Sequence, residues 1–160
     1  MRTILSTNGY TILVDSHLVE ELSKYNWLVN KLGYAQTKTG TKQVTTYIHK
    51  LVAKLENFPE FKEIDHIDRN KLNNQASNLR PATRSQNMAN RSKRSGYSSS
   101  YKGVSYDRFT SKWRAQLKVN NKHVLAKRFA TEIEAAKAYD KAAFEAWGEF
   151  ATLNFPEDYQ

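Results

Sequence analysis

The chain has 160 residues, which is enough for one ordinary domain or two small ones. Lysine and arginine total 25 against 16 acidic residues, and the net charge of +9 favours a polyanionic partner, nucleic acid before a membrane. No apolar run is long enough to span a bilayer, and the lack of cysteine excludes disulfides and zinc–thiolate sites, so any metal must be held by oxygen and nitrogen ligands.

Turn residues between short apolar runs predict a strand-rich N-terminal segment. Asn8-Gly9 lies between two such runs and is a strong hairpin pattern. Asp15 or Ser16 can cap a short helix. We expect strands at 4–5, 10–14, 27–29, 34–36 and 44–48 and a helix at 49–55.

The middle of the chain predicts a hairpin with a long polar loop, followed by a helix. We expect an extended segment at 61–67, an asparagine-rich loop at 68–77 and a second strand at 79–82. Thr83 or Ser85 can cap a helix that runs through Asn90. Residues 91–100 are basic and rich in serine, as linkers often are. We therefore place the domains at 1–92 and 100–160, with a linker at 93–99.

The C-terminal part predicts a three-stranded antiparallel sheet packed on one helix, which makes the chain an α+β protein. Strands are expected at 101–106, 112–119 and 122–129, with Asn120-Asn121 as a two-residue turn. Thr131 and Glu134 form a capping box at the start of a helix that Gly148 ends. The expected buried stripe of that helix consists of Ile133, Ala136, Tyr139, Ala143, Phe144 and Trp147.

Charge is distributed unevenly along the chain. Residues 1–90 carry a net +4, residues 91–130 carry +10 with Asp107 as their single acid, and residues 131–160 carry −5. A solvated face usually mixes its signs. The middle segment therefore predicts a contact surface for nucleic acid.

Residues 65 to 87 combine the groups that phosphodiester hydrolysis needs. A neutral histidine such as His66 can accept a proton from water near neutral pH. One carboxylate and one amide oxygen suffice for Mg²⁺, which keeps several waters, and Asp65 and Asn87 can supply them. Asn78 is placed to hold the loop in shape and so orient His66. His49 is more often a packed or capping histidine, His17 a surface residue, and His123 is no metal candidate.

These residues resemble the HNH homing endonucleases of phages and mobile introns. The resemblance rests on His49-Lys50-Leu51-Val52-Ala53, Ile64-Asp65-His66-Ile67-Asp68, Leu72-Asn73-Asn74, Asn78-Leu79-Arg80 and Asn87-Met88-Ala89-Asn90. It covers about residues 45–92, and asparagine at the third motif position matches the HNN variant. It implies a ββα-metal nuclease core, His66 as general base, Asp65 and Asn87 as ligands of one Mg²⁺ or Mn²⁺ ion per site, and Asn78 as the loop-stabilising residue. The implied products are a 5′-phosphate and a 3′-hydroxyl.

The C-terminal segment resembles the ethylene-response-factor (APETALA-two) DNA-binding domain over about residues 99–156. The matching stretches are Tyr101-Lys102-Gly103-Val104, Trp113-Arg114-Ala115-Gln116, Phe129-Ala130-Thr131, Glu134–Asp140 and Leu153-Asn154-Phe155-Pro156. In that family the sheet reads the major groove. The positions carried over are Lys102, Arg114, Gln116, Lys118 and His123, while Ser105 and Asp107 fall near positions where plant members use arginine. We also expect Arg80 and Arg84 to contact DNA.

Together the patterns predict a monomeric, metal-dependent, site-recognising DNA endonuclease. We expect it to nick double-stranded DNA without a membrane or an obligate protein partner. We also expect a phage gene whose product acts in the bacterial cytoplasm. One alternative is a non-catalytic DNA-binding regulator, and another is a protein that binds or cuts RNA. The sheet lacks the exposed aromatic pairs expected for base stacking on RNA.

Overall fold

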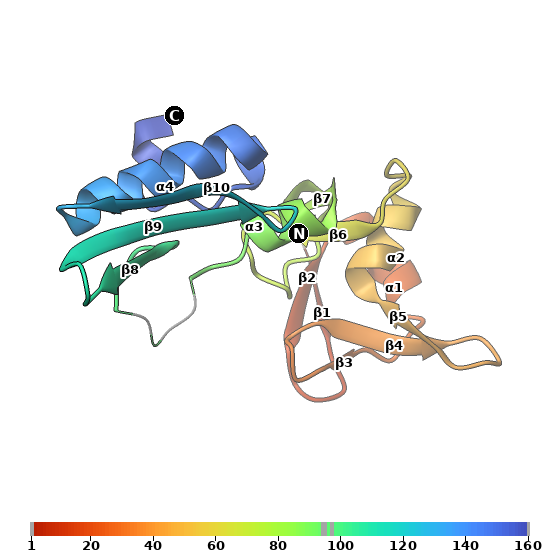
Figure 1. Ribbon diagram of the computed structural model, residues 1–160. Helices are drawn as coiled ribbons and strands as arrows, with labels where there is room; N and C mark the ends of the chain where they lie inside the picture. The colour runs from red at the N-terminus through yellow and green to blue at the C-terminus, as the bar shows by residue number, and fades with distance from the viewer. Residues whose placement is uncertain (1, 94–95, 97, 160) are drawn as a thin grey trace. The chain divides into compact units, whose positions relative to one another are not determined.

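A computed structural model describes residues 2–93, 96 and 98–159 (Figure 1). The chain forms two compact units, Met1–Thr83 and Arg84–Gln160. The predicted linker at 93–99 lies partly outside the described residues. None of the helices in the described part of the chain combines the length and the apolar composition that crossing a bilayer requires.

The first unit begins with the expected hairpin. Strands β1 (Arg2–Leu5) and β2 (Thr11–Val14) pair in antiparallel fashion, and Gly9 in the turn has φ 86°, which glycine adopts without strain. A short helical segment follows as η1 (Ser16–Leu18) and α1 (Val19–Leu22). Asp15 precedes it but makes no side-chain cap; its Oδ2 instead accepts a hydrogen bond from the Ala76 N–H at 2.7 Å.

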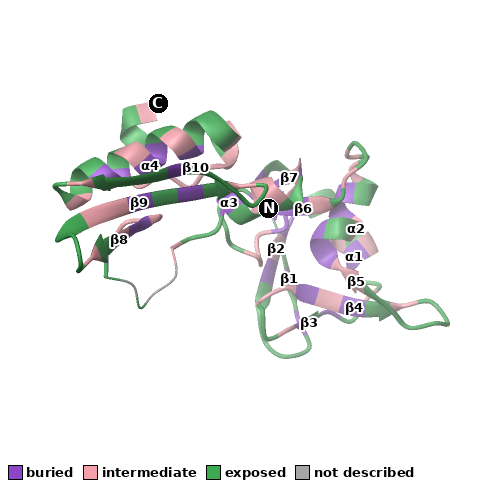
Figure 2. Cartoon of the chain, viewed as in Figure 1, coloured by how far each residue is buried: buried purple, intermediate pink, exposed green. Residues whose placement is uncertain are grey.

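A three-stranded antiparallel sheet and a helix complete the frame of this unit. The sheet contains β3 (Leu28–Val29), β4 (Ala35–Thr39) and β5 (Val44–Tyr47), and α2 (Ile48–Leu55) follows directly. Figure 2 shows buried residues along β4 and α2, whereas β5 has none. The largest fully buried side chains of its core are those of Trp27, Ile12, Leu22, Ile48, Val14 and Val52. Burial of each large apolar side chain contributes about 1.5–3 kcal/mol relative to exposure.

The second hairpin of this unit carries the asparagine-rich loop. Strands β6 (Glu63–His66) and β7 (Leu79–Ala82) pair in antiparallel fashion, with η2 (Ala76–Asn78) just before β7. The loop is tied to β2: Leu13 N–H donates to the Leu72 carbonyl and Asn74 N–H donates to the Leu13 carbonyl, both at 2.8 Å. The N-terminal hairpin therefore fixes the backbone of a loop that follows it by some sixty residues in the printed sequence.

The second unit starts with α3 (Arg84–Ala89), which follows β7 and gives the β-β-α order of elements. Its sheet has the antiparallel order β10–β9–β8, with β8 at Val104–Asp107, β9 at Lys112–Val119 and β10 at Lys122–Phe129. Asn120 and Asn121 both have positive φ, 49° and 63°, as a tight hairpin turn requires. The α+β class and the three-stranded sheet are confirmed.

Helix α4 (Glu132–Trp147) packs on this sheet and has the expected capping box, before the short turns η3 (Gly148–Phe150) and η4 (Pro156–Tyr159). A Cβ at Gly103 would lie 1.9 Å from Tyr139 Cδ2, so only glycine fits where the sheet edge approaches the helix. Asp140, fully buried, accepts bonds from the N–H groups of Asn154 and Phe155 and anchors the C-terminal segment.

The expected stripe of α4 is wrong at two positions. Ile133 and Phe144 are 53% and 42% exposed, whereas Ala135 and Asp140 are buried. At about 100° per residue, Ile133 and Phe144 lie roughly 120–140° around the helix from Tyr139, outside the face that meets the sheet. Small residues line that face, and Phe144 instead packs on Tyr159 with ring centroids 4.9 Å apart.

Candidate active site

Asp65 and His66 end strand β6 and are both buried, with 4% and 5% of their surface exposed. The register pairs Asp65 with Arg80 and His66 with Leu79 across the hairpin. Because neighbours in a strand point to opposite faces, the two side chains have different surroundings. Each is therefore held by its own set of partners.

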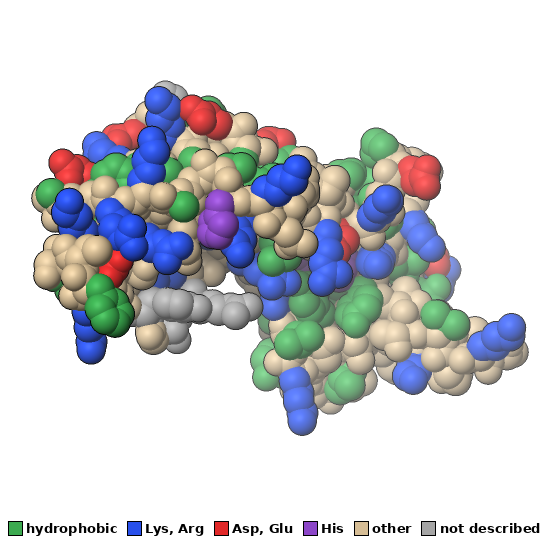
Figure 3. Space-filling view, in the orientation of Figure 1, with side chains coloured by type: hydrophobic (Ala, Val, Ile, Leu, Met, Phe, Trp, Pro, Cys, Tyr) green, Lys and Arg blue, Asp and Glu red, His purple; other side chains and the backbone are tan. Residues whose placement is uncertain are grey.

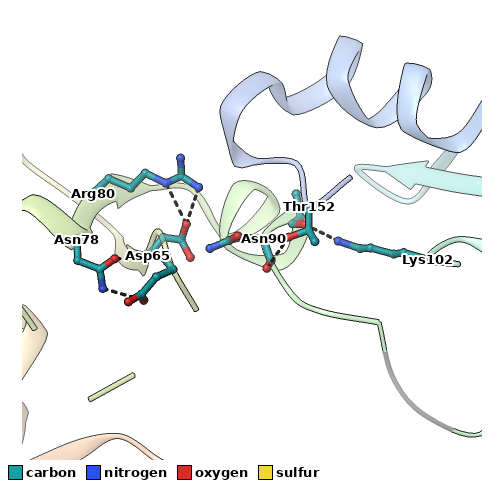
Figure 4. Close-up of polar contacts among 8 residues, drawn as sticks. Asp65, Asn78, Arg80, Asn90, Lys102 and Thr152 are labelled. Atoms are coloured by element: carbon teal, nitrogen blue, oxygen red, sulfur yellow. Dashed lines mark hydrogen bonds and ion pairs between the residues drawn. The ribbon is translucent and has the colours of Figure 1, made fainter. Parts of the chain in front are cut away.

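The asparagine-rich loop is closed by Asn78 (Figure 4). Its Oδ1 accepts the Asp68 N–H at 3.1 Å, and its Nδ2 donates to Asp68 Oδ1 at 2.9 Å and to the Asn73 carbonyl at 2.8 Å. Burial acts to raise the pKa of Asp68, but hydrogen bonds from Asn73, Asn78 and Asn70 outweigh it and lower that pKa. These bonds hold the two ends of the loop together just beyond His66.

His66 lies among aromatic rings and one amide. Its Nε2 is 3.1 Å from Oδ1 of Asn74, a residue that is fully buried. His49 meets it edge-on with centroids 5.2 Å apart, and the Tyr34 ring lies 6.2 Å away. Burial lowers the pKa of His66, although the Asn74 bond and the charges of Asp68 and Asp65 act in the opposite direction. The imidazole is thus neutral at neutral pH, as a general base must be.

His49 is packed rather than solvated. It stacks on Tyr47 at 5.5 Å, and burial, together with the nearby His66, lowers its pKa to about 3. Within the described chain, its Nδ1 is a buried nitrogen that has no hydrogen-bond partner. A histidine with so low a pKa stays uncharged, so it adds no second positive charge beside His66.

Asp65 is ion-paired with Arg80. Both Nε and Nη2 of Arg80 lie 3.0 Å from Asp65 Oδ2, and both side chains are largely buried (Figure 4). No group of three or more His, Cys, Asp or Glu side chains that could hold a metal occurs among the described residues. The predicted pair of ligands, the Asp65 carboxylate and the Asn87 amide, would supply two oxygens, a donor set that fits a hard dication retaining its waters.

Asn87 lies on α3, in the other compact unit from Asp65 and His66. Within its own unit α3 is well anchored: Trp147 Nε1 donates to Ser85 Oγ at 3.0 Å, and Thr152 N–H donates to the Ala89 carbonyl at 3.2 Å. The pairing of Asn87 with Asp65 as metal ligands remains a prediction, as does the domain boundary after residue 92.

The second unit presents basic side chains on the open face of its sheet (Figure 3). Along β9, Gln116 and Lys118 are exposed and Arg114 half-buried, while Ala115 and Leu117 are buried against α4. His123 on β10 is exposed and pairs in register with Lys118. Arg84 is exposed at the start of α3. The alternation therefore separates a packed face from a face that is available to a ligand.

Three contacts were not foreseen from the sequence. Lys102, expected on DNA, donates its Nζ to the Ala89 carbonyl at the end of α3. Arg128, which the sequence analysis did not select, pairs in register with Arg114, and its Nε donates to Asp107 Oδ2 at 2.7 Å, which lowers the pKa of Asp107. Asn74 was one asparagine among several in the sequence; its side chain contacts His66, and its backbone N–H donates to the Leu13 carbonyl of β2.

Comparison with known proteins gives matches in both parts of the chain. Residues 46–89 match the family described as HNH endonuclease, and residues 99–149 match the AP2 domain. The chain is 38% identical over 134 residues to an uncharacterised HNH endonuclease of Acanthamoeba polyphaga mimivirus, covering 83% of this chain and 68% of the relative. That relative belongs to a virus, but the virus is not a bacteriophage. No solved structure gave a significant match.

Proposed function

The chain belongs to the HNH endonucleases, and we propose that it is a metal-dependent enzyme that recognises a DNA site and hydrolyses a phosphodiester bond there. The observation that carries the proposal is the β6–β7 hairpin, where a buried imidazole and a buried carboxyl group occupy consecutive positions with separate partners. The products would be a 5′-phosphate and a 3′-hydroxyl.

In this proposal His66 takes a proton from the attacking water. Burial keeps the imidazole neutral, and the Asn78 clamp keeps the loop beyond it in one shape. Asp65 and Asn87 would hold one Mg²⁺ or Mn²⁺ ion. When bound, such an ion stabilises charge on the phosphate and on the leaving oxygen. Arg80 is held beside the Asp65 carboxylate. A guanidinium in that position can also pair with a phosphate.

The C-terminal sheet would dock the enzyme on double-stranded DNA. Arg114 and Gln116 can read base edges in the major groove, while Lys118 and His123 can hold phosphates. Arg128 belongs to the same exposed face. Arg84 and Lys102 complete the proposed contacts. Lys102 would contribute less, because its side chain already bonds to the Ala89 carbonyl.

We further propose that the protein acts as a monomer and nicks one strand, because each chain carries one copy of the site. A homing role for a mobile gene, a phage origin and action in the bacterial cytoplasm are the remaining parts of the proposal. The mimivirus relative supports a virus-borne gene without supporting the bacterial host.

Incubation of supercoiled plasmid with the full chain and Mg²⁺ tests the proposal. We expect nicked circles with the wild type, intact plasmid with EDTA, and intact plasmid with His66→Ala, which should still bind DNA. Intact plasmid with every protein would instead indicate a DNA-binding regulator. Linear plasmid at limiting protein, without a nicked intermediate, would refute the nicking mode. If duplex RNA competes for the protein as effectively as duplex DNA does, the result would favour an RNA substrate.

A further inference from the structure

The side chain of Asn74 lies between the imidazole of His66 and the backbone of Lys71. Its Oδ1 is 3.1 Å from His66 Nε2, and its Nδ2 donates to the Lys71 carbonyl at 3.2 Å. Asn74 is fully buried and His66 is 5% exposed. The bond to His66 is therefore buried away from bulk water and the bond to Lys71 is partly buried, and an unmatched polar group in a buried site is costly.

The two partners of Asn74 settle which way its amide faces. The Lys71 carbonyl can only accept a hydrogen bond, so the amide nitrogen must face it. A reversed amide would place two oxygens against each other in a buried site, with no hydrogen between them. The amide oxygen consequently faces His66, and an amide oxygen can only accept.

The same reasoning fixes the hydrogen on the histidine. Nε2 of His66 must donate to Asn74 Oδ1, and a neutral imidazole carries a single N–H. We propose that Asn74 is a positioning residue of the active site, which holds His66 in its Nε2–H tautomer and so presents Nδ1 as the proton acceptor. This inference deepens the proposed function and rests on it for the identity of the reaction.

The proton transfer is then defined atom by atom. The O–H bond of the attacking water breaks, its proton goes to Nδ1 of His66, and its oxygen bonds to phosphorus while the bond from phosphorus to the 3′ oxygen breaks. The leaving 3′ oxygen takes a proton from solvent water, which gives the 3′-hydroxyl, and the imidazolium later returns its proton to solvent. With the hydrogen on Nδ1 instead, the acceptor lone pair would face Asn74.

Asn74 is held in place by the N-terminal hairpin. Its N–H donates to the Leu13 carbonyl at 2.8 Å, and Leu13 N–H donates to the Leu72 carbonyl at 2.8 Å. Neighbouring Asn73 has another task, because its Nδ2 donates to Asp68 Oδ2 at 2.8 Å. A buried side chain on a fixed backbone can keep a catalytic group oriented before substrate binds.

The first test reads the tautomer directly. Nitrogen-15 NMR of the full chain in EDTA at neutral pH distinguishes protonated from unprotonated imidazole nitrogens, and comparison with His66→Gln assigns His66 among the four histidines. We expect His66 to carry its hydrogen on Nε2. A hydrogen on Nδ1 would overturn the inference. The spectrum requires no cleavage, so inactivity of the wild type would count against the proposed function and leave this result standing.

Two substitutions separate the accepting role of Asn74 from a purely structural one. Asn74→Asp can still accept a hydrogen bond from His66 Nε2 but cannot donate one to the Lys71 carbonyl. Asn74→Ala can make neither bond. We expect Asn74→Ala to mix the tautomers and lower the single-turnover nicking rate by about 10²-fold or more with little change in DNA affinity. Asn74→Asp should keep the Nε2–H tautomer and stay within about tenfold of the wild-type rate.

Asn73→Ala is the matched control and should leave the His66 spectrum unchanged. Wild-type tautomer and rate in Asn74→Ala would refute the positioning role. Equal loss of rate in Asn74→Asp and Asn74→Ala, with the tautomer kept in the former, would assign Asn74 to loop structure only. If Asn74→Ala fails to fold, the wild-type spectrum and Asn74→Asp decide the question.

Discussion

Replacing Asn78 with alanine tests whether side-chain hydrogen bonds hold the loop between β6 and β7. The substitution removes three bonds, to the Asp68 N–H, the Asp68 carboxylate and the Asn73 carbonyl. Bonds between neutral groups contribute about 1 kcal/mol each and a bond to a charged group about 2 kcal/mol. Asp68 is exposed, so water replaces part of the lost interaction. We therefore expect unfolding to become about 2–3 kcal/mol easier, a large share of the roughly 5–15 kcal/mol of an ordinary domain.

Urea unfolding measures this change if only the first unit is observed. The chain has three tryptophans, and Trp27 alone is buried in the first unit, so a Trp113→Phe/Trp147→Phe background makes its fluorescence the reporter. Ser77→Ala, at an exposed neighbouring position, should change stability by less than about 0.5 kcal/mol. A loss below about 1 kcal/mol for Asn78→Ala would show that the loop is held by its backbone alone.

The same variant should alter the response to acid. The folded-state pKa of Asp68 is lowered by hydrogen bonds that outweigh its burial, two of them from Asn73 and Asn78. A depressed folded-state pKa gives stability that is present above the unfolded value, near 4, and is lost as pH falls through the lower folded value. Asn78→Ala should therefore lose less additional stability than the wild type below about pH 4. An identical acid response would exclude Asn78 as a cause of the shift.

Three further predictions concern single side chains. His49→Phe removes a buried nitrogen that has no partner and a histidine whose pKa is about 3. The wild type should lose stability as pH falls below about 6.5, by up to about 1.4 kcal/mol per pH unit, because this histidine takes up a proton only in the unfolded state. In thermal melts the variant should retain that stability. A steeper loss would contradict this. Asn87→Ala should raise the Mg²⁺ concentration needed for half-maximal nicking, and an unchanged titration would remove Asn87 from the ligand set. Arg128→Ala should lower DNA affinity: a phosphate contact would reduce the salt slope by about 0.9, a base contact would relax sequence preference, and unchanged binding would remove Arg128 from the interface.

The sequence predicted those elements whose cause is local. Strands β9 and β10 were placed correctly because side chains alternate along them and Asn120-Asn121 tolerate positive φ. The cap of α4 followed from Thr131 and Glu134 alone. The positions of Asp65, His66 and Asn78 within one hairpin followed from their short spacing, because a loop of this length can close on itself.

Contacts between distant segments could not be predicted in this way. Which asparagine of the loop faces His66 depends on bonds from Leu13, far away in the sequence. Asp15 or Ser16 was expected to cap a helix, yet the Asp15 side chain makes no cap and accepts a hydrogen bond from Ala76. The bond from the Lys102 side chain to the end of α3 was not predicted either. In each case a polar side chain has several local options, and tertiary packing selects a partner that the local pattern does not contain.

The alternation of strand β6 explains how adjacent residues can serve opposite chemical roles. Asp65 points to the face where Arg80 pairs with its side chain. His66 points to the face lined by Tyr34 and His49, where burial favours an imidazole without charge. A carboxyl group that can bind a metal ion and an imidazole that can accept a proton from water can thus occupy consecutive positions. Moving either residue by one position would exchange their surroundings, so the order of Asp65 and His66 matters as much as their presence.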